Sequence, residues 1–212
     1  MRTKTKALAL ALCAVLLVVS TVFVTMAFLT DRDSVTNTFT FGQVGISLDE
    51  ADVDVNGKVE AGGNRESTEG RVQGNEYHLI PGHNYVKDPT IHVDDSSENC
   101  LLFVKLENGL KDIIASKTIE EQMENNGWTC IDTTNNIWAY NKVVAENDHI
   151  EVFDEFTLTD DAVVSNYGDA TIIITAYAVQ ADGFVVNTAK DAAVSVTDAE
   201  NAWGETKNSF GN

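Results

Sequence analysis

Short segments in which apolar and polar residues alternate recur along this chain, and they constrain its fold more than any other feature. A period of two places β-branched and aromatic side chains on one face of a strand. The clearest segments lie at residues 35–41, 44–48, 85–93, 100–106, 128–131, 137–144, 150–158 and 170–179. With turn residues between them, about eight or nine strands predict an all-β fold, an antiparallel β-sandwich of jelly-roll type. An open barrel would give the same pattern.

The strands differ in how buried they are expected to be. Residues 100–106 and 170–179 are apolar on both faces, which predicts two buried strands, the first of them central. Pro89 confines the stretch 85–93 to a sheet edge or a strand start, because proline has no backbone N–H. A phase slip between residues 150–153 and 156–158 predicts a β-bulge.

One segment changes from the strand period to a helical one. The apolar positions that carry the helical spacing are Leu110, Ile113, Ile114, Ile119 and Met123. Asn125-Asn126-Gly127 then ends the segment as helices commonly end. We expect one short inserted helix, or two turns broken near Ser116. Residues 189–203 have weak helical character, and the polar tail 204–212 is expected to be loose.

A long acidic, glycine-rich insert at residues 49–76 interrupts the expected sandwich domain, residues 39–203. It is predicted to be a surface loop or a weak hairpin. The first half of an oxygen-ligand calcium loop is matched by Asp52, Asp54 and Asn56. Gly63 stands where the bidentate carboxylate should be, so diffuse binding of divalent ions by an acidic surface is the favoured alternative.

The charge of the chain is strongly negative, with 14 basic and 33 acidic residues and a formal net charge of −19. The first 27 residues hold three basic residues (Arg2, Lys4 and Lys6) and no acidic one, so the remainder carries a formal charge of −22. Nucleic acid would be repelled over such a surface. We therefore expect no nucleic-acid partner.

Residues 1–27 have the three parts of a secretory signal peptide: a basic start, a long apolar stretch, and small side chains at Thr25 and Ala27. Cleavage is expected between Ala27 and Phe28. The alternative is an uncleaved membrane anchor, because the apolar stretch reaches the roughly 20 residues that span a bilayer. In both cases the acidic part faces outward, which predicts a secreted or cell-surface protein.

The reactive residues give little sign of catalysis. Cys13 lies in the leader, and the mature chain would keep Cys100 and Cys130, either as a disulfide or as two buried thiols. His78 and His83 flank a Pro-Gly turn and are expected to be exposed loop residues. Because no nucleophile, zinc or nucleotide-binding motif is present, we expect no enzyme activity.

Several stretches resemble a family of secreted proteins of Gram-positive bacteria that the SipW-type signal peptidase processes, a group that includes TasA-like and camelysin-like proteins. The stretches that carry the resemblance are the signal running into Phe28-Leu29-Thr30-Asp31, then Asn37-Thr38-Phe39-Thr40, Pro81-Gly82 with Lys87-Asp88-Pro89-Thr90, the strand Cys100 to Val104, Thr118-Ile119-Glu120 through Asn126-Gly127-Trp128-Thr129, and Ile174 to Gly183. The insert 49–76 is where the chain is least typical of the group.

The resemblance implies a jelly-roll sandwich that is exported and assembles into extracellular fibres of a biofilm matrix. In fibre-forming members the segment behind the cleavage site becomes a strand donated to the next subunit, which maps here to residues 28–38. The residues expected to carry polymerisation are Phe28, Leu29, Val35, Thr36 and Thr38. The implied partners are further copies of the chain, a SipW-type signal peptidase and an accessory matrix protein. The alternatives are a camelysin-like cell-surface metallopeptidase and a monomeric surface or spore-coat-associated protein.

Overall fold

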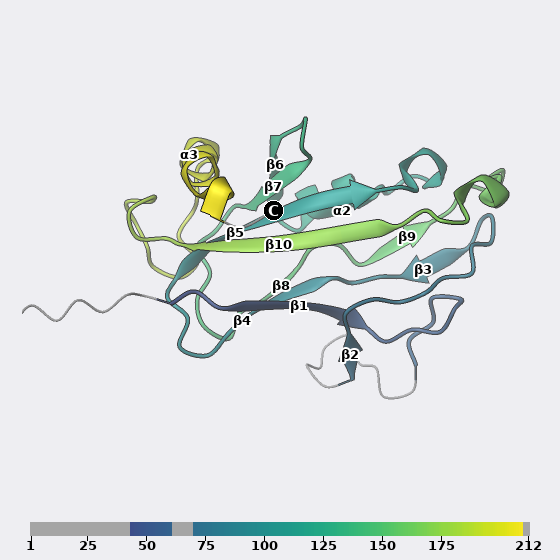
Figure 1. Cartoon of the computed structure of the whole chain (residues 1–212), viewed down its shortest axis with the longest axis horizontal. Coiled ribbons are helices and arrows are strands. Elements are labelled where there is room, and N and C mark those ends of the chain that lie inside the picture. Colours follow the sequence, from purple (N-terminus) through teal and green to yellow (C-terminus); the bar gives the residue numbers. More distant parts are fainter. Residues whose placement is uncertain (1–42, 61–69, 210–212) are drawn as a thin grey trace, which may run out of the picture. The chain divides into compact units, whose positions relative to one another are not determined.

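The structure, a computed structural model, describes residues 43–60 and 70–209, which fold mostly into antiparallel β-strands with two short α-helices (Figure 1). The expected all-β class is confirmed. One four-stranded sheet has the order β2-β1-β4-β8, with β1 (Ile46–Ala51), β2 (Arg71–Val72), β4 (Thr90–Val93) and β8 (His149–Glu151). A second has the order β10-β5-β7-β6, with β5 (Cys100–Asn108), β6 (Trp128–Asp132), β7 (Ile137–Tyr140) and β10 (Ile172–Gln180). A third sheet pairs β3 (Asn84–Val86) with β9 (Glu155–Thr157).

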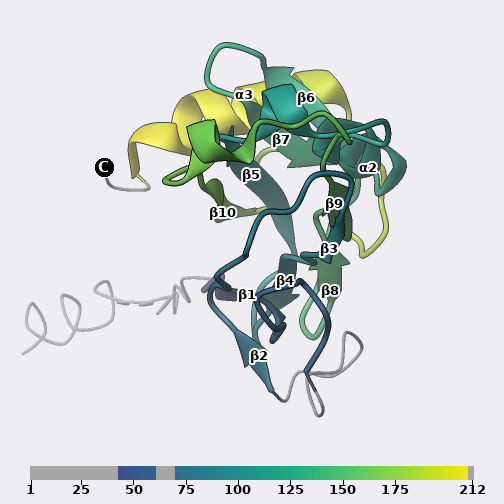
Figure 2. The same ribbon diagram turned by 90° about the vertical axis from the view of Figure 1, so that its right-hand side faces the viewer.

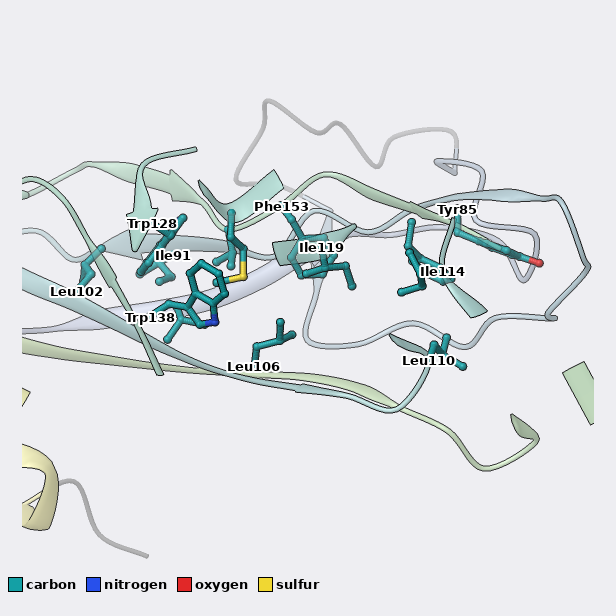
Figure 3. Packing of buried hydrophobic residues seen from close by; sticks show 14 of the residues in the cluster. Tyr85, Ile91, Leu102, Leu106, Leu110, Ile114, Ile119, Trp128, Trp138 and Phe153 are labelled. Atoms are coloured by element: carbon teal, nitrogen blue, oxygen red, sulfur yellow. The ribbon is translucent and has the colours of Figure 1, made fainter. Parts of the chain in front are cut away.

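The two four-stranded sheets share one hydrophobic core (Figure 3). Alternate side chains of β5 enter it, namely Leu102, Val104 and Leu106, as the period of two predicts. Ile91 and Val93 of β4 meet them from the other sheet. Each fully buried aliphatic or aromatic side chain contributes about 1.5–3 kcal/mol. The core therefore fixes which face of each sheet points inward.

The opposite face of β5 is covered by α3 (Val196–Thr206), which lies across that side of the sheet (Figure 2). Leu101 and Phe103 pack there against Ala199, Ala202 and Trp203. This second cluster explains why β5 is apolar on both faces. The strand order, with β5 between β10 and β7, confirms the prediction that β5 is a central strand.

Strand β10 is not the buried strand that its composition predicts. It is the edge strand of its sheet, and none of its residues falls in the buried class. Its two apolar faces have separate causes, because one face packs on the shared core and the other lies near α3. Apolar residues on both faces of a strand thus show that each face is covered by other parts of the protein. They do not show whether the strand has a neighbour on both of its hydrogen-bonding edges.

The inserted helical segment is divided into two separate turns, which is the second of the two predicted alternatives. A 3-10 turn at Lys111–Ile113 precedes α2 (Ile119–Asn125). Thr118 and Glu121 form a reciprocal capping box at the start of α2. Gly127 follows the helix with a φ of 91°, a conformation that favours glycine.

The C-terminal region corrects two predictions. A second helix, α3, begins behind Ser195, whose hydroxyl accepts the N–H of Asp198, so the expected single helix was too few. The helix continues through Thr206 into a 3-10 turn at Lys207–Ser209. The prediction of a loose tail is therefore wrong for residues 204–209.

Three further boundaries differ from the predicted ones. The insert does not begin at residue 49, because Asp49, Glu50 and Ala51 belong to β1. The stretch 85–93 is divided between β3 and β4, which lie in different sheets. The expected bulge near residue 154 is instead a passage between sheets, since β8 pairs with β4 and β9 pairs with β3.

Candidate functional site

The outer edge of β10 presents backbone groups that no described strand pairs. Gly109 donates its N–H to the Thr171 carbonyl and Ala181 donates to the Asn99 carbonyl. Because hydrogen-bonded pairs alternate in an antiparallel ladder, the odd-numbered residues of β10 bond to β5. The even-numbered residues direct their N–H and C=O groups to the open edge: Ile172, Ile174, Ala176, Ala178 and Gln180.

Strand β1 lies on this open side of β10 in both views (Figures 1 and 2). Residues 46–49 of β1 pair with β4 on one side, and on the other side β2 pairs only with Glu50 and Ala51. Within residues 43–60 and 70–209, no ladder joins β1 directly to β10. Two strand edges thus face one another without pairing.

A groove with a volume of about 820 Å³ lies beside these edges. Its walls come from residues 48–50 of β1, residues 73–79, and residues 164–174, which lead into β10. The apolar side chains that line it include Leu48, Leu79, Leu110, Phe156, Ile172 and Ile174. An apolar groove beside an unpaired strand edge can take an extended peptide, which would bond to the edge and place alternate side chains in the groove.

One wall of the groove holds a buried ion pair. Lys87 Nζ lies 2.5 Å from Glu50 Oε2, and the two side chains are only 10% and 6% exposed. Asn75 Nδ2 donates to Glu50 Oε1 at 2.8 Å. The Tyr77 hydroxyl donates to the Val86 carbonyl, and burial raises the pKa of Tyr77 well above its usual value. Asn75 thus holds the segment 73–79 against β1, and Tyr77 holds it against β3.

Arg71 anchors the end of the insert to the same sheet. Its guanidinium contacts Asp49 Oδ1 at 2.5 Å and Asp88 Oδ2 at 3.1 Å, and it also donates to Thr90 Oγ1. The Asp88 carboxylate in turn accepts the N–H of Ala51. The two-residue strand β2 is held mainly by these charged contacts, because its ladder is too short to be stable alone.

The residues predicted as a calcium loop form a hairpin turn. The Asp54 carboxylate accepts the N–H groups of Asn56 and Lys58, and these bonds lower the pKa of Asp54. The Asp52 carbonyl accepts the N–H of Glu60, which closes the turn. Among the described residues, no three His, Cys, Asp or Glu side chains converge as a metal site. In the described part of this loop the Asp54 carboxylate holds the turn.

Cys100 and Cys130 are free thiols, so the disulfide alternative is wrong. Cys130 lies opposite Trp138, and Trp138 lies opposite Val104, four residues from Cys100 along β5. Strands β5 and β6 are separated by β7, which puts them about 9.6 Å apart before that offset is added. A disulfide needs Cα atoms within about 7 Å.

The two thiols should differ in reactivity. Cys100 is fully buried, and burial, with a smaller contribution from the charge of Asp148, raises its pKa to about 12. Only the thiolate is nucleophilic. We expect iodoacetamide at pH 8 to modify Cys130 slowly and Cys100 only after unfolding, as read by peptide mass spectrometry of the purified protein. A linked Cys100–Cys130 peptide, or equal labelling of both native thiols, would contradict this.

The structure also brings together two histidines that the sequence pattern did not connect. His92 of β4 lies directly opposite His149 of β8, and their Nδ1 atoms are 2.5 Å apart. His92 Nε2 lies 2.8 Å from Asp49 Oδ1 in β1. The signal was weak in sequence, because 57 residues separate the pair. His78 is exposed as predicted, whereas His83 is half-buried and bonds to the Asn56 carbonyl.

The expected cleavage site at Ala27 and Phe28 and the donor segment 28–38 lie outside the described residues. Within the described part of the chain, no helix has the length and hydropathy to cross a membrane. Comparisons of this chain with protein-family models, with curated proteins and with solved structures find no match.

Proposed function

We propose that this chain is a secreted structural subunit of extracellular matrix fibres, with a jelly-roll domain that accepts an N-terminal strand from the next copy. The donor is the segment 28–38, freed when a SipW-type signal peptidase cleaves the leader behind Ala27. The acceptor is the open edge of β10 together with the groove between β10 and β1. The partners are other copies of the chain, with an accessory matrix protein as a further component.

The single observation that carries the proposal is the long apolar strand edge beside an apolar groove. A strand edge of this kind is a template for a further strand unless a protein blocks it with proline, charge or a bulge. Residues 172–179 contain none of these: Ile-Ile-Ile-Thr-Ala-Tyr-Ala-Val. An occupant that pairs with this edge would gain backbone hydrogen bonds and bury its apolar side chains.

The proposed donor and acceptor match in length. The 9 residues of β10 span about 30 Å, and an extended segment 28–38 would span about 36 Å. The segment begins with the apolar pair Phe28 and Leu29, is charged at residues 31–33, and ends in a β-prone stretch that contains Val35, Thr36 and Thr38. A donor at one end and an acceptor elsewhere give a head-to-tail contact that does not close, so assembly continues as a filament.

Deleting residues 28–37 from the mature protein is the direct test. We expect the mature protein to form filaments visible by negative-stain electron microscopy and the deletion variant to remain monomeric in sedimentation velocity. A synthetic peptide of residues 28–38 should cap the acceptor and shorten the filaments, whereas a scrambled peptide of the same composition should not. Filaments from the deletion variant as abundant as those of the intact mature protein would refute strand donation.

A further inference from the structure

We propose that His92 and His149 form a binding site for a single first-row divalent transition-metal ion, Zn²⁺ or Cu²⁺, on the face of the β2-β1-β4-β8 sheet that points away from the core. The site is independent of fibre assembly. Its basis is the convergence of two imidazole nitrogens from neighbouring strands.

The register of the sheet places the two rings together. His92 and His149 are direct partners in the β4–β8 ladder, so their side chains leave the sheet on the same face. Ile91 and Val93 on either side of His92 are buried in the core, which puts His92 on the other face. The ring centroids lie 4.6 Å apart and the rings are inclined at 69°. The two Nδ1 atoms therefore point into one small space.

A carboxylate orients the first ligand. Asp49 Oδ1 accepts a hydrogen bond from His92 Nε2–H at 2.8 Å, which leaves the lone pair of His92 Nδ1 directed toward His149. Metal-binding histidines commonly donate their second ring N–H to a carboxylate in this way, and the contact increases the basicity of the ligand. Arg71 Nε donates to the same oxygen, Asp49 Oδ1, so the carboxylate is fixed in position.

The geometry needs only a small adjustment to accept an ion. Two nitrogens bound to one tetrahedral metal at 2.0–2.1 Å lie about 3.3 Å apart. The present separation is 2.5 Å, so the rings must move apart by less than about 1 Å. His149 can make this movement because it is exposed and lies on the edge strand β8. The remaining coordination positions face solvent and would hold water.

The surroundings suit a cation with a preference for imidazole. The carboxylates of Asp49 and Asp88 outweigh the single charge of Arg71 next to His92. Imidazole binds Zn²⁺ and Cu²⁺ well, with Cu²⁺ the tighter in the usual order of divalent affinities, whereas Ca²⁺ prefers oxygen.

Titration calorimetry of the full chain with Zn²⁺, Cu²⁺ and Ca²⁺ tests the site. We expect saturable binding of one Zn²⁺ or Cu²⁺ and no heat from Ca²⁺ at this site. His149→Gln should abolish it, while His78→Gln, which changes another exposed histidine, should leave it unchanged. Asp49→Asn should weaken affinity by roughly 10–100-fold. A thermal melt of each variant without metal checks that the fold persists.

A second measurement locates the ion. Cu²⁺ is paramagnetic and should broaden the amide signals of Ile91, Val93 and Ile150 first in a ¹H–¹⁵N spectrum. Broadening centred on His78 or His83, no saturable binding at millimolar metal, or wild-type affinity in a folded His149→Gln variant would each overturn the proposal. Loss of metal binding with intact filaments would separate this site from the proposed fibre function.

Discussion

A proline at position 174 should abolish filament formation by the mature protein and leave its β-sheet fold in place. Ile174 belongs to the set of β10 residues whose N–H points to the open edge, and its side chain lines the groove. Proline removes this donor and crowds the approach of an incoming strand, but it takes no hydrogen bond from the β5–β10 ladder. The measurements are electron microscopy for filaments and circular dichroism for the fold.

The neighbouring residue offers a matched control. Ile173 is the same residue type, but its backbone faces Glu107 in a hydrogen-bonded pair of the β5–β10 ladder. Ile173→Pro should therefore lower the free energy of unfolding by about 1–3 kcal/mol, because proline removes a ladder bond and leaves its acceptor on β5 unpaired. Ile174→Val, which keeps the backbone donor, should assemble normally. Normal filaments from Ile174→Pro would show that the edge of β10 does not accept the donor.

These variants depend on the position of β10 at the edge of its sheet, which no local sequence pattern reveals. The sequence of β10 predicted a buried strand, since both faces are apolar, and the structure makes it an edge strand. What the pattern records is the cover on each face, by the core and by α3. Which strands stand beside it depends on pairing between distant segments, and β5 lies about 70 residues earlier. The same two-faced pattern gave the right result for β5 only because β5 pairs with both β10 and β7.

The candidate sites show the same contrast between features that depend on neighbouring residues and features that depend on distant segments. The helix end at Gly127 was predicted correctly, because it depends on residues that are neighbours in the sequence. The expected export suggested that the two cysteines could form a disulfide, but the register separates them by an intervening strand. The groove and the histidine pair are built by segments far apart in the chain, and only the ladder register reveals them.

Replacing Lys87 by methionine should lower the free energy of unfolding by about 3–5 kcal/mol. The change removes the only cation within 2.5 Å of Glu50 among the described salt bridges and leaves a buried carboxylate with the Asn75 amide as its described hydrogen-bond donor. Breaking a buried pair in this way costs about 3–5 kcal/mol, whereas removing both charges is often nearly neutral. Urea unfolding followed by tryptophan fluorescence gives the values.

The double variant Lys87→Met/Glu50→Gln separates the charge from the packing. Glutamine keeps the volume of Glu50 and an oxygen that can accept the Asn75 bond, so we expect the double variant to recover most of the lost stability. Lys105→Met is the exposed control: Lys105 and Glu107 are 37% and 51% exposed, and losing this pair should cost less than about 1 kcal/mol. A Lys87→Met loss as small as that of Lys105→Met would mean that water screens the inner pair. Lys87 and Glu50 both line the groove. A large loss of stability in Lys87→Met would therefore mean that the ion pair that stabilises β1 also fixes the groove wall that faces β10.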